Sequence, residues 1–325
     1  MSSRDTRSVP RILFTSLSKK ISLYEAVQRQ ARNFHPQAEL VGGDSDPLCL
    51  GRERIKLFVQ TPSMETVSFE EFTTFCREQS ITHLIPTRDG ELDFFAKARP
   101  VLLLAGIHSM ISPPEAIATC LDKFQFAQTA AGLGFSAIPT FESLDQLEAS
   151  RVTVKERHGS GSSGVYLDLS AQEAAKRAID LREPIFQPHV RGRELSADVY
   201  IDQSGQSRGV ILRWRDLVIN GESKITTTFR NPAWECKIED LAVRIGLRGH
   251  ALVQAIVDKD LQIHFLEINA RLGGATSLAL ASGLRSIEWF LTEASGEILE
   301  PPPFDYQDGK RLTRNTEGRD QITEV

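Results

Sequence analysis

The stretch Phe265-Leu266-Glu267-Ile268-Asn269-Ala270-Arg271-Leu272-Gly273-Gly274 alternates apolar side chains with a carboxylate, an amide and a guanidinium. In an extended strand, successive side chains point to opposite faces. The predicted polar face carries Phe265, Glu267, Asn269 and Arg271, and the predicted core face carries Leu266, Ile268 and Ala270. Mg²⁺ takes few protein oxygens and leaves most of its octahedron to water and phosphates. We therefore interpret this segment as a platform for a metal ion and phosphate groups.

The composition is that of an ordinary globular protein. Its 325 residues, 41% of them hydrophobic, are enough for two or three packed units. The formal net charge of −5 argues against nucleic acid or an anionic membrane as the main partner. The four cysteines have no zinc-site spacing, and no window approaches 18 consecutive apolar residues. We expect a cytoplasmic protein in a reducing compartment.

The first third of the chain alternates short apolar runs with helical patterns. Strands are predicted at 11–15, 39–41, 56–59 and 83–86, and Leu23, Val27 and Ala31 recur at helical spacing. This alternation is typical of an open parallel sheet in an α/β protein. The segment from Ser112 to Glu115 predicts a helix with Ser112 as its N-cap, and Asp122 is predicted to cap the next helix. A first domain boundary is placed near residue 112.

A glycine-rich segment follows a predicted strand that ends in Lys155. Gly159, Gly161 and Gly164 match G-x-G-x-x-G, a pattern that alone is a weak signal. A dinucleotide fingerprint must open a helix, but residues 165–169 alternate like a strand. A P-loop needs its lysine after the last glycine, whereas Lys155 comes before the first one, so this segment is not a P-loop. The remaining interpretation is a flap between antiparallel strands, whose backbone N–H groups close over phosphates. The alternative is a flexible surface hairpin.

A second strand, at residues 185–187, enters a linker that leads to Glu194 and another apolar strand. Such a linker can pair its backbone with a purine edge, and a carboxylate at its end can accept hydrogen bonds from ribose hydroxyls. Taken alone, the segment is better explained by a solvated turn that carries a charged residue.

These constellations, in this order, resemble the ATP-grasp superfamily and its branch similar to the carbamoyl-phosphate synthase large chain. The resemblance covers nearly the whole chain. It implies an α/β fold in which an N-terminal open parallel-sheet domain precedes a two-subdomain ATP-grasp module. The expected boundaries are 1–112 for the first domain, 113–187 for the linker helices and glycine-flap lid, and 188–325 for the core with its C-terminal tail.

The resemblance also implies a role for each matching residue. ATP phosphates would be bound by Lys123, Lys155 and the flap residues Gly159, Ser160, Gly161, Ser162 and Gly164. The adenine would be lined by Gln187, Pro188, His189 and Val190, and the ribose held by Glu194. Mg²⁺, with Mn²⁺ as an alternative, would be held by Gln254, Glu267 and Asn269. Arg271 would face the reacting acyl phosphate and, with Lys155, act catalytically.

Three positions depart from the pattern of many relatives. Glu156 replaces a frequent proline, and Gln187 replaces a frequent glutamate. Gln254 stands where many members have an acidic metal ligand, and a neutral ligand holds Mg²⁺ less strongly. The last departure leaves open a catalytically inactive, ATP-binding protein.

The loop after the strand at 83–86 is a candidate substrate site, because ligands of open parallel sheets bind at the carboxyl ends of strands. Asp89 and Glu91 are its predicted substrate-binding residues. A helix-capping turn is the alternative.

The resemblance implies an ATP-dependent carboxylate-amine ligase that forms an acyl phosphate and releases ADP and phosphate. The partners of this enzyme would be a small carboxylate and an amine. The resemblance also allows a homodimer. A carbamoyl-phosphate or carboxyphosphate-forming enzyme shares the same residues and is the enzymatic alternative.

Overall fold

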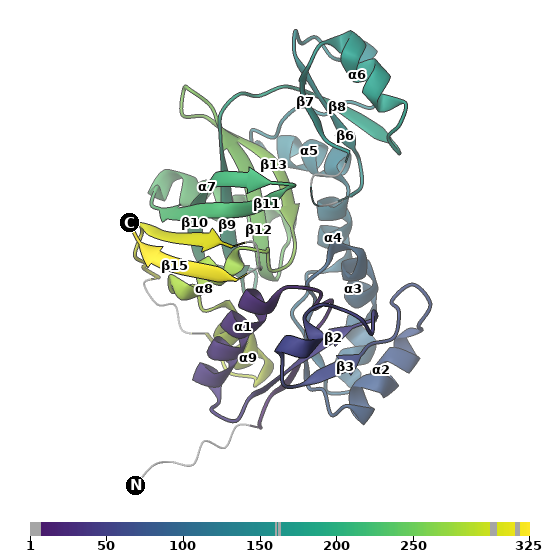
Figure 1. Ribbon diagram of the computed structural model, residues 1–325, viewed down its shortest axis with the longest axis vertical. Coiled ribbons are helices and arrows are strands. Elements are labelled where there is room, and N and C mark those ends of the chain that lie inside the picture. The colour runs from purple at the N-terminus through teal and green to yellow at the C-terminus, as the bar shows by residue number, and fades with distance from the viewer. Residues whose placement is uncertain (1–7, 160, 162–163, 300–303, 316–318) are drawn as a thin grey trace.

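The computed structural model describes residues 8–159, 161, 164–299, 304–315 and 319–325. Within these ranges the chain forms a parallel sheet of five strands and two antiparallel sheets of three and seven strands. Figure 1 shows the N-terminal sheet at one end of the molecule, the three-stranded sheet at the other, and the largest sheet between them. The predicted α/β fold class is confirmed.

The N-terminal sheet has the strand order β3-β2-β1-β4-β5. Its strands are β1 (Arg11–Phe14), β2 (Glu39–Asp44), β3 (Phe58–Gln60), β4 (His83–Ile85) and β5 (His108–Ser109). Its helices are α1 (Ile21–Phe34), α2 (Phe69–Glu78) and α3 (Asp89–Leu104), with a short 3₁₀ turn η1 (Arg52–Arg54). The strand order reverses between β1 and β4, so the loops that follow these two strands flank a crevice at the carboxyl edge of the sheet.

Two helices connect this sheet to the rest of the molecule, α4 (Pro114–Leu121) and α5 (Lys123–Gly132). Asp122 caps α5 as predicted, because its carboxylate accepts from the backbone N–H groups of Phe124 and Gln125. The prediction that Ser112 caps α4 is wrong. Its hydroxyl instead exchanges two 2.9 Å hydrogen bonds with the backbone of Arg248, which ties the start of α4 to the large sheet.

The three-stranded sheet has the order β7-β6-β8 and is covered by a single helix. Its elements are β6 (Val152–Glu156), β7 (Tyr166–Leu169), α6 (Ala171–Ala178) and β8 (Pro184–Pro188), preceded by η2 (Leu144–Gln146). β6 and β7 are antiparallel, so the glycine-rich segment connects two antiparallel strands as predicted.

The large sheet has the order β13-β12-β9-β10-β11-β14-β15. Its strands are β9 (Arg193–Ile201), β10 (Ser207–Ile219), β11 (Glu222–Phe229), β12 (Gly249–Val257), β13 (Ile263–Asn269), β14 (Lys310–Arg314) and β15 (Asp320–Glu324). The helices are α7 (Pro232–Ile245), α8 (Thr276–Ala281) and α9 (Ser286–Ala294). α7 packs on β9 and β10, while α8 and α9 pack against α1 of the N-terminal domain. Two apolar clusters each extend from the first sheet to the large sheet.

A β-bulge in β13 puts Phe265 and Leu266 on the faces opposite to those predicted. Gln254 pairs with Glu267 and Ala255 pairs with Phe265, so Leu266 is an extra residue without a partner on β12. Phe265 is therefore in the core, where its ring contacts Phe135, and Leu266 lines a cavity. Both predictions were wrong because an inserted residue reverses the alternation on one side of it.

The three sheets fall within 11–109, 152–188 and 193–324, and the expected domain limits stay a prediction. In the described ranges, no helix is long and apolar enough to cross a membrane.

Candidate nucleotide and substrate site

A cavity of about 690 Å³ lies between the three-stranded sheet and the large sheet. Its lining contains most of the residues predicted to bind a nucleotide: Lys123, Lys155, Gly159, Gly161, Gln187, Pro188, His189, Val190, Glu194, Gln254 and Glu267. Gly164 lies just before β7, at the end of the glycine-rich segment. Its φ of +65° favours glycine, and a Cβ there would lie 2.9 Å from Leu181, too close for a side chain. Ser160 and Ser162 lie outside the described residues.

Two buried lysines reach this cavity from different elements. Lys155 projects from β6, and Lys123 begins α5 and donates from Nζ to the backbone oxygen of Gly159 at 2.7 Å. Burial lowers the pKa of Lys155 to about 8; Glu267 raises this pKa and Lys123 lowers it. Two ammonium groups brought together in a buried site favour binding of an anion such as a phosphate.

The linker between β8 and β9 forms another wall of the cavity. The Gln187 side chain is 2% exposed, and its amide nitrogen donates to Thr140 Oγ1 at 2.7 Å, which leaves the amide oxygen as its acceptor. His189 Nδ1 lies 3.1 Å from Thr153 Oγ1, so this ring is hydrogen-bonded to β6. Glu194, at the start of β9, is half-exposed and lies 3.0 Å from Arg215 Nε.

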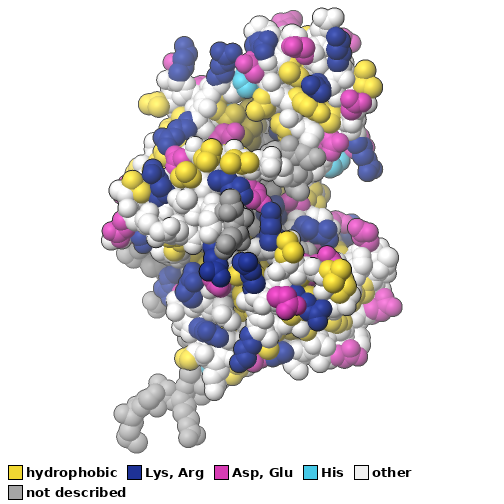
Figure 2. Space-filling model, in the orientation of Figure 1, with side chains coloured by type: hydrophobic (Ala, Val, Ile, Leu, Met, Phe, Trp, Pro, Cys, Tyr) yellow, Lys and Arg dark blue, Asp and Glu magenta, His cyan; other side chains and the backbone are white. Residues whose placement is uncertain are grey.

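A second cavity of about 520 Å³ adjoins the first and extends toward the N-terminal sheet. Gly161, Arg215, Gly221, Gln254 and Glu267 line both cavities. Figure 2 shows Lys and Arg side chains gathered near the middle of this face, between the two halves of the molecule. The strand end that carries Glu267 therefore lies where the two cavities meet.

Only part of the predicted metal-binding set fits a cation. The Gln254 amide lies between two charged groups, and in the orientation that satisfies both, its nitrogen donates to Glu267 Oε1 (3.0 Å) and its oxygen accepts from Arg215 Nη1 (2.7 Å). This oxygen therefore already accepts a short hydrogen bond from a charged group, whereas the oxygen of Asn269 has a longer contact, 3.2 Å from Arg271 Nη2. Within the described residues, no cluster of three or more His, Cys, Asp and Glu side chains could hold a metal. Glu267 and the neighbouring amide of Asn269 remain, and they suit an ion that completes its sphere with phosphate oxygens.

Arg271 is held at the same strand end by a residue 182 positions earlier. Its Nε and Nη2 donate to the two carboxylate oxygens of Asp89, at 2.8 and 2.5 Å, and Nη2 also lies 3.2 Å from Asn269 Oδ1. A bidentate guanidinium–carboxylate pair fixes orientation as well as position. Asp89 therefore lies at the site, where it orients Arg271.

Glu91 does not share this position. Its carboxylate is 1% exposed and accepts from Thr15 Oγ1, Ser16 Oγ and the backbone N–H groups of Thr87 and Arg88. Four hydrogen bonds saturate this carboxylate, so the alternative of a helix-capping turn explains Glu91 and we no longer propose it as a substrate contact.

Sequence reasoning missed seven of the eight cationic residues that line the second cavity, Arg213, Arg215 and Lys20 among them. Arg213 and Arg215 alternate along β10, where charged residues in an otherwise apolar strand were a usable signal. Lys20 follows β1 in the crevice between β1 and β4, and no motif marks it.

Comparison with known proteins gives the same architecture. A family model described as "ATP-grasp in the biosynthetic pathway with Ter operon" matches residues 180–317. The D-alanine–D-alanine ligase of Fusobacterium nucleatum subsp. nucleatum is 23% identical over 208 residues, which are 60% of this chain and 71% of that protein.

Two solved structures cover 94% of the chain at 15% sequence identity. The biotin carboxylase-beta-gamma-ATP complex from Campylobacter jejuni has a TM-score of 0.73 over 75% of its chain. The L-amino acid ligase from Bacillus licheniformis has a TM-score of 0.68 over 79% of its chain. At such identities the likeness is one of fold, and with the family match it agrees with the site built above.

Proposed function

We propose that this chain is an ATP-dependent ligase of the ATP-grasp type that joins a carboxylate to an amine, from the family match over residues 180–317 and the shared fold. The observation that carries the proposal is the pair of adjoining cavities that share Glu267 and Arg215. A reaction that transfers phosphate from a nucleotide to a second substrate needs two such compartments with a common wall.

The larger cavity is proposed to bind ATP. Lys123 and Lys155 would neutralise the phosphates, and the flap would close over them with its backbone N–H groups. The Gln187 amide oxygen is available to accept from the adenine amino group, and Glu194 is placed at the end of the linker for the ribose. Closure would also keep water away from a reactive intermediate.

Glu267 and Asn269 would hold one Mg²⁺ ion together with the nucleotide phosphates, and the ion would supply charge neutralisation during phosphoryl transfer. Gln254 is not included, because its oxygen is engaged by Arg215.

The proposed chemistry has two steps. A carboxylate oxygen of the substrate attacks the γ-phosphorus, the bond from that phosphorus to ADP breaks, and an acyl phosphate forms. The nitrogen lone pair of an amine then attacks the acyl carbon, phosphate leaves with the bonding electrons, and the amine proton passes to phosphate or solvent. Arg271, oriented by Asp89, would stabilise the negative charge that develops on the acyl oxygen.

The small carboxylate and amine are the proposed partners, and a reducing cytoplasm is the proposed compartment. The described structure supports the second point, since Cys49, Cys76, Cys120 and Cys236 are all free thiols.

An inactive ATP-binding protein is the second candidate, favoured by the single observation that Glu267 is the one charged residue among the three predicted metal ligands. The experiment that separates these candidates measures ADP and phosphate release from Mg-ATP across a matrix of carboxylic acids and amines. The ligase is expected to release both products only when an acid is present. Turnover with bicarbonate and no organic acid would identify a carboxyphosphate-forming enzyme, and ATP binding without ADP release under every condition would leave the inactive protein.

A further inference from the structure

The second cavity is assembled from distant parts of the chain at the crevice between β1 and β4. The loop after β1 contributes Lys19 and Lys20, the start of β11 contributes Glu222 and Lys224, and the end of β13 contributes Arg271. In open parallel sheets this crevice is where ligands bind. The cavity is therefore the natural place for the acid that the neighbouring nucleotide would activate.

Its lining is strongly biased toward positive charge. Eight Lys and Arg residues line the cavity, against two carboxylates, Glu222 and Glu267. A cavity with low-dielectric walls and one sign of charge concentrates ligands of the opposite sign. One acid group and one metal ion do not require so many cations.

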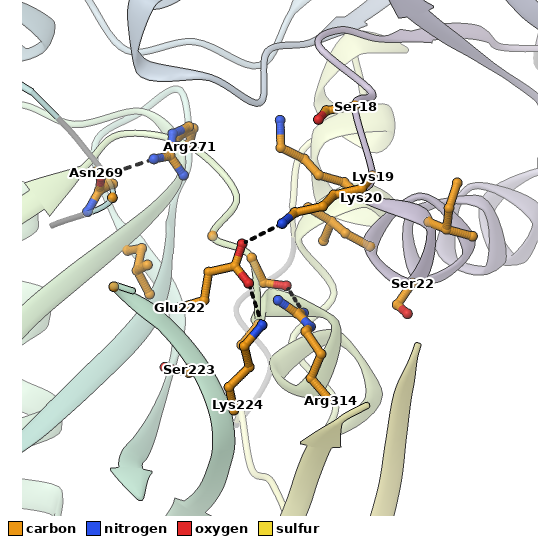
Figure 3. A pocket seen from close by; sticks show the side chains of 18 of the residues that line it. Ser18, Lys19, Lys20, Ser22, Glu222, Ser223, Lys224, Asn269, Arg271 and Arg314 are labelled. Carbon is orange, nitrogen blue, oxygen red and sulfur yellow. Dashed lines mark hydrogen bonds and ion pairs between the residues drawn. The ribbon is translucent and has the colours of Figure 1, made fainter. Parts of the chain in front are cut away.

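Some of these charges are neutralised by carboxylates of the protein, and others are not. Four of the eight are arginines paired with carboxylates: Arg271 with Asp89, the buried Arg213 with Asp198, Arg215 with Glu194 and Arg314 with Asp320. In contrast, Lys19 and Lys224 share one carboxylate, that of Glu222, at 3.4 and 2.8 Å. Figure 3 shows Glu222 between these two lysines, on the opposite side of the cavity from Arg271 and Asn269.

Lys20 is a largely buried cation whose described hydrogen bonds do not go to a carboxylate. The described contacts of its Nζ are hydrogen bonds to the backbone oxygen of Ser16 (2.6 Å) and to Thr87 Oγ1 (3.0 Å). Both acceptors are neutral. Its ammonium charge is therefore compensated only at a distance, by Glu91 and Asp44, and an anionic ligand in the cavity would stabilise it further.

The titration of Lys20 agrees with this geometry. Burial lowers its pKa to about 8; Glu91 and Asp44 raise the pKa, while Arg271 and Arg88 lower it. A protein that places a lysine where its charged form is disfavoured leaves that charge to be stabilised by a bound anion.

We propose that the acid received by this cavity carries a second anionic group, a carboxylate or a phosphate, which Lys20 and Lys224 bind while the reacting carboxylate lies against Arg271. This inference rests on the proposed ligase function, because it takes the cavity to be the acid site. It restricts the substrate class to dicarboxylates and phosphorylated acids.

The test compares three short-chain acids of similar length: glutarate, 3-phosphonopropionate and butyrate. Thermal unfolding with Mg-ADP present reports binding without turnover. We expect glutarate or 3-phosphonopropionate to raise Tm and butyrate at equal concentration to leave it unchanged; the better of the two dianions identifies the second group. In Lys20→Met and in Lys224→Met the increase should be lost, whereas the control Lys97→Met, on the exposed face of α3, should keep it.

Stabilisation by butyrate equal to that by the dianions, or stabilisation that survives in both cavity variants, would overturn the inference. So would a failure of both dianions to stabilise the wild type. In the turnover assay, the wild type should have at least a tenfold lower KM for dianionic acids than for monoanionic ones, and Lys20→Met should abolish this difference without changing the KM for ATP.

The two proposals fail differently. If the dianions bind selectively through Lys20 but no acid yields ADP, the ligase function is refuted and the anion site remains. If monocarboxylates turn over as well as dianions, the ligase stands and the inference is lost. Raising the pH from 7 to 9 should weaken dianion binding to the wild type, because the Lys20 ammonium loses its proton above about 8, whereas any dianion binding that remains in Lys20→Met should not show this dependence.

Discussion

Replacing Asp89 by asparagine tests whether the carboxylate on α3 orients the guanidinium at the end of β13. In the structure Asp89 accepts from Arg271 Nε at 2.8 Å and from Nη2 at 2.5 Å, and both side chains are largely buried. Asparagine keeps the shape but presents an NH₂ group to one of these donors, so one charge-assisted hydrogen bond is lost and one contact becomes repulsive.

Hydrogen bonds to charged groups contribute a net ~1.5–3 kcal/mol each. If ~2 kcal/mol of transition-state stabilisation depends on the orientation of Arg271, kcat/KM for the acid should fall by roughly 30-fold, at ~1.36 kcal/mol per factor of ten. The affinity for ATP should change less than about twofold, because Asp89 does not line the nucleotide cavity. The measurements are initial rates of ADP formation with varied acid at saturating ATP, and calorimetric titration with ATP.

Two matched variants accompany this measurement. Asp93→Asn makes the same substitution one turn later on α3, where Asp93 pairs with the exposed Lys97, and should change neither parameter. Glu91→Gln should lower Tm, because a buried, saturated cap is disturbed, while the activity of the folded fraction persists. If Asp89→Asn retains kcat/KM within about threefold of wild type, Arg271 does not depend on this partner and the orienting role is refuted.

Three further predictions concern charges in and below the site. Lys155→Met should weaken ATP binding by ~1.5–3 kcal/mol in calorimetry. In wild type the affinity for ATP should fall as pH rises through about 8, because Lys155 then loses its positive charge, and a pH-independent Kd would contradict this. Glu267→Gln should reduce ADP formation by at least ~100-fold at saturating ATP, and a smaller loss would place the metal elsewhere. Asp198→Ala should lower the free energy of unfolding in urea by ~3–5 kcal/mol, because it leaves the buried Arg213 unpaired; a loss under about 1 kcal/mol would mean that another group compensates this charge.

The fold and the course of the nucleotide-binding segments could be predicted from the sequence because both rest on local patterns. Alternating apolar runs predicted β1, β2, β3 and β4, and the glycine segment between two alternating stretches predicted antiparallel strands around a flap. The α/β class is confirmed, and the expected ATP-grasp resemblance is supported by a family model that matches residues 180–317 and by the fold of the solved structures. The individual roles of the site residues stay predictions, although the structure brings most of them to one cavity.

Local patterns misled where one residue changes the count or where two neighbours look alike. The extra residue Leu266 turned Phe265 into the core, because strand alternation holds only while each residue has a partner. Asp89 and Glu91 are two positions apart with the same charge, yet one faces Arg271 and the other caps its own helix.

By itself, the sequence determined the strands β1 to β4, the strands on either side of the glycine segment and the start of α5, and that two lysines, a glycine flap and a carboxylate–amide strand end occur in a fixed order. The tertiary structure alone decided that Gln254 turns its oxygen to Arg215, that Asp89 holds Arg271, and that Lys20 reaches a cation-lined cavity where its described hydrogen bonds go to neutral oxygens. The physical reason is distance along the chain. Hydrogen bonds and ion pairs depend on atoms within about 3–4 Å of each other, and their partners are chosen by how the sheets pack rather than by sequence spacing.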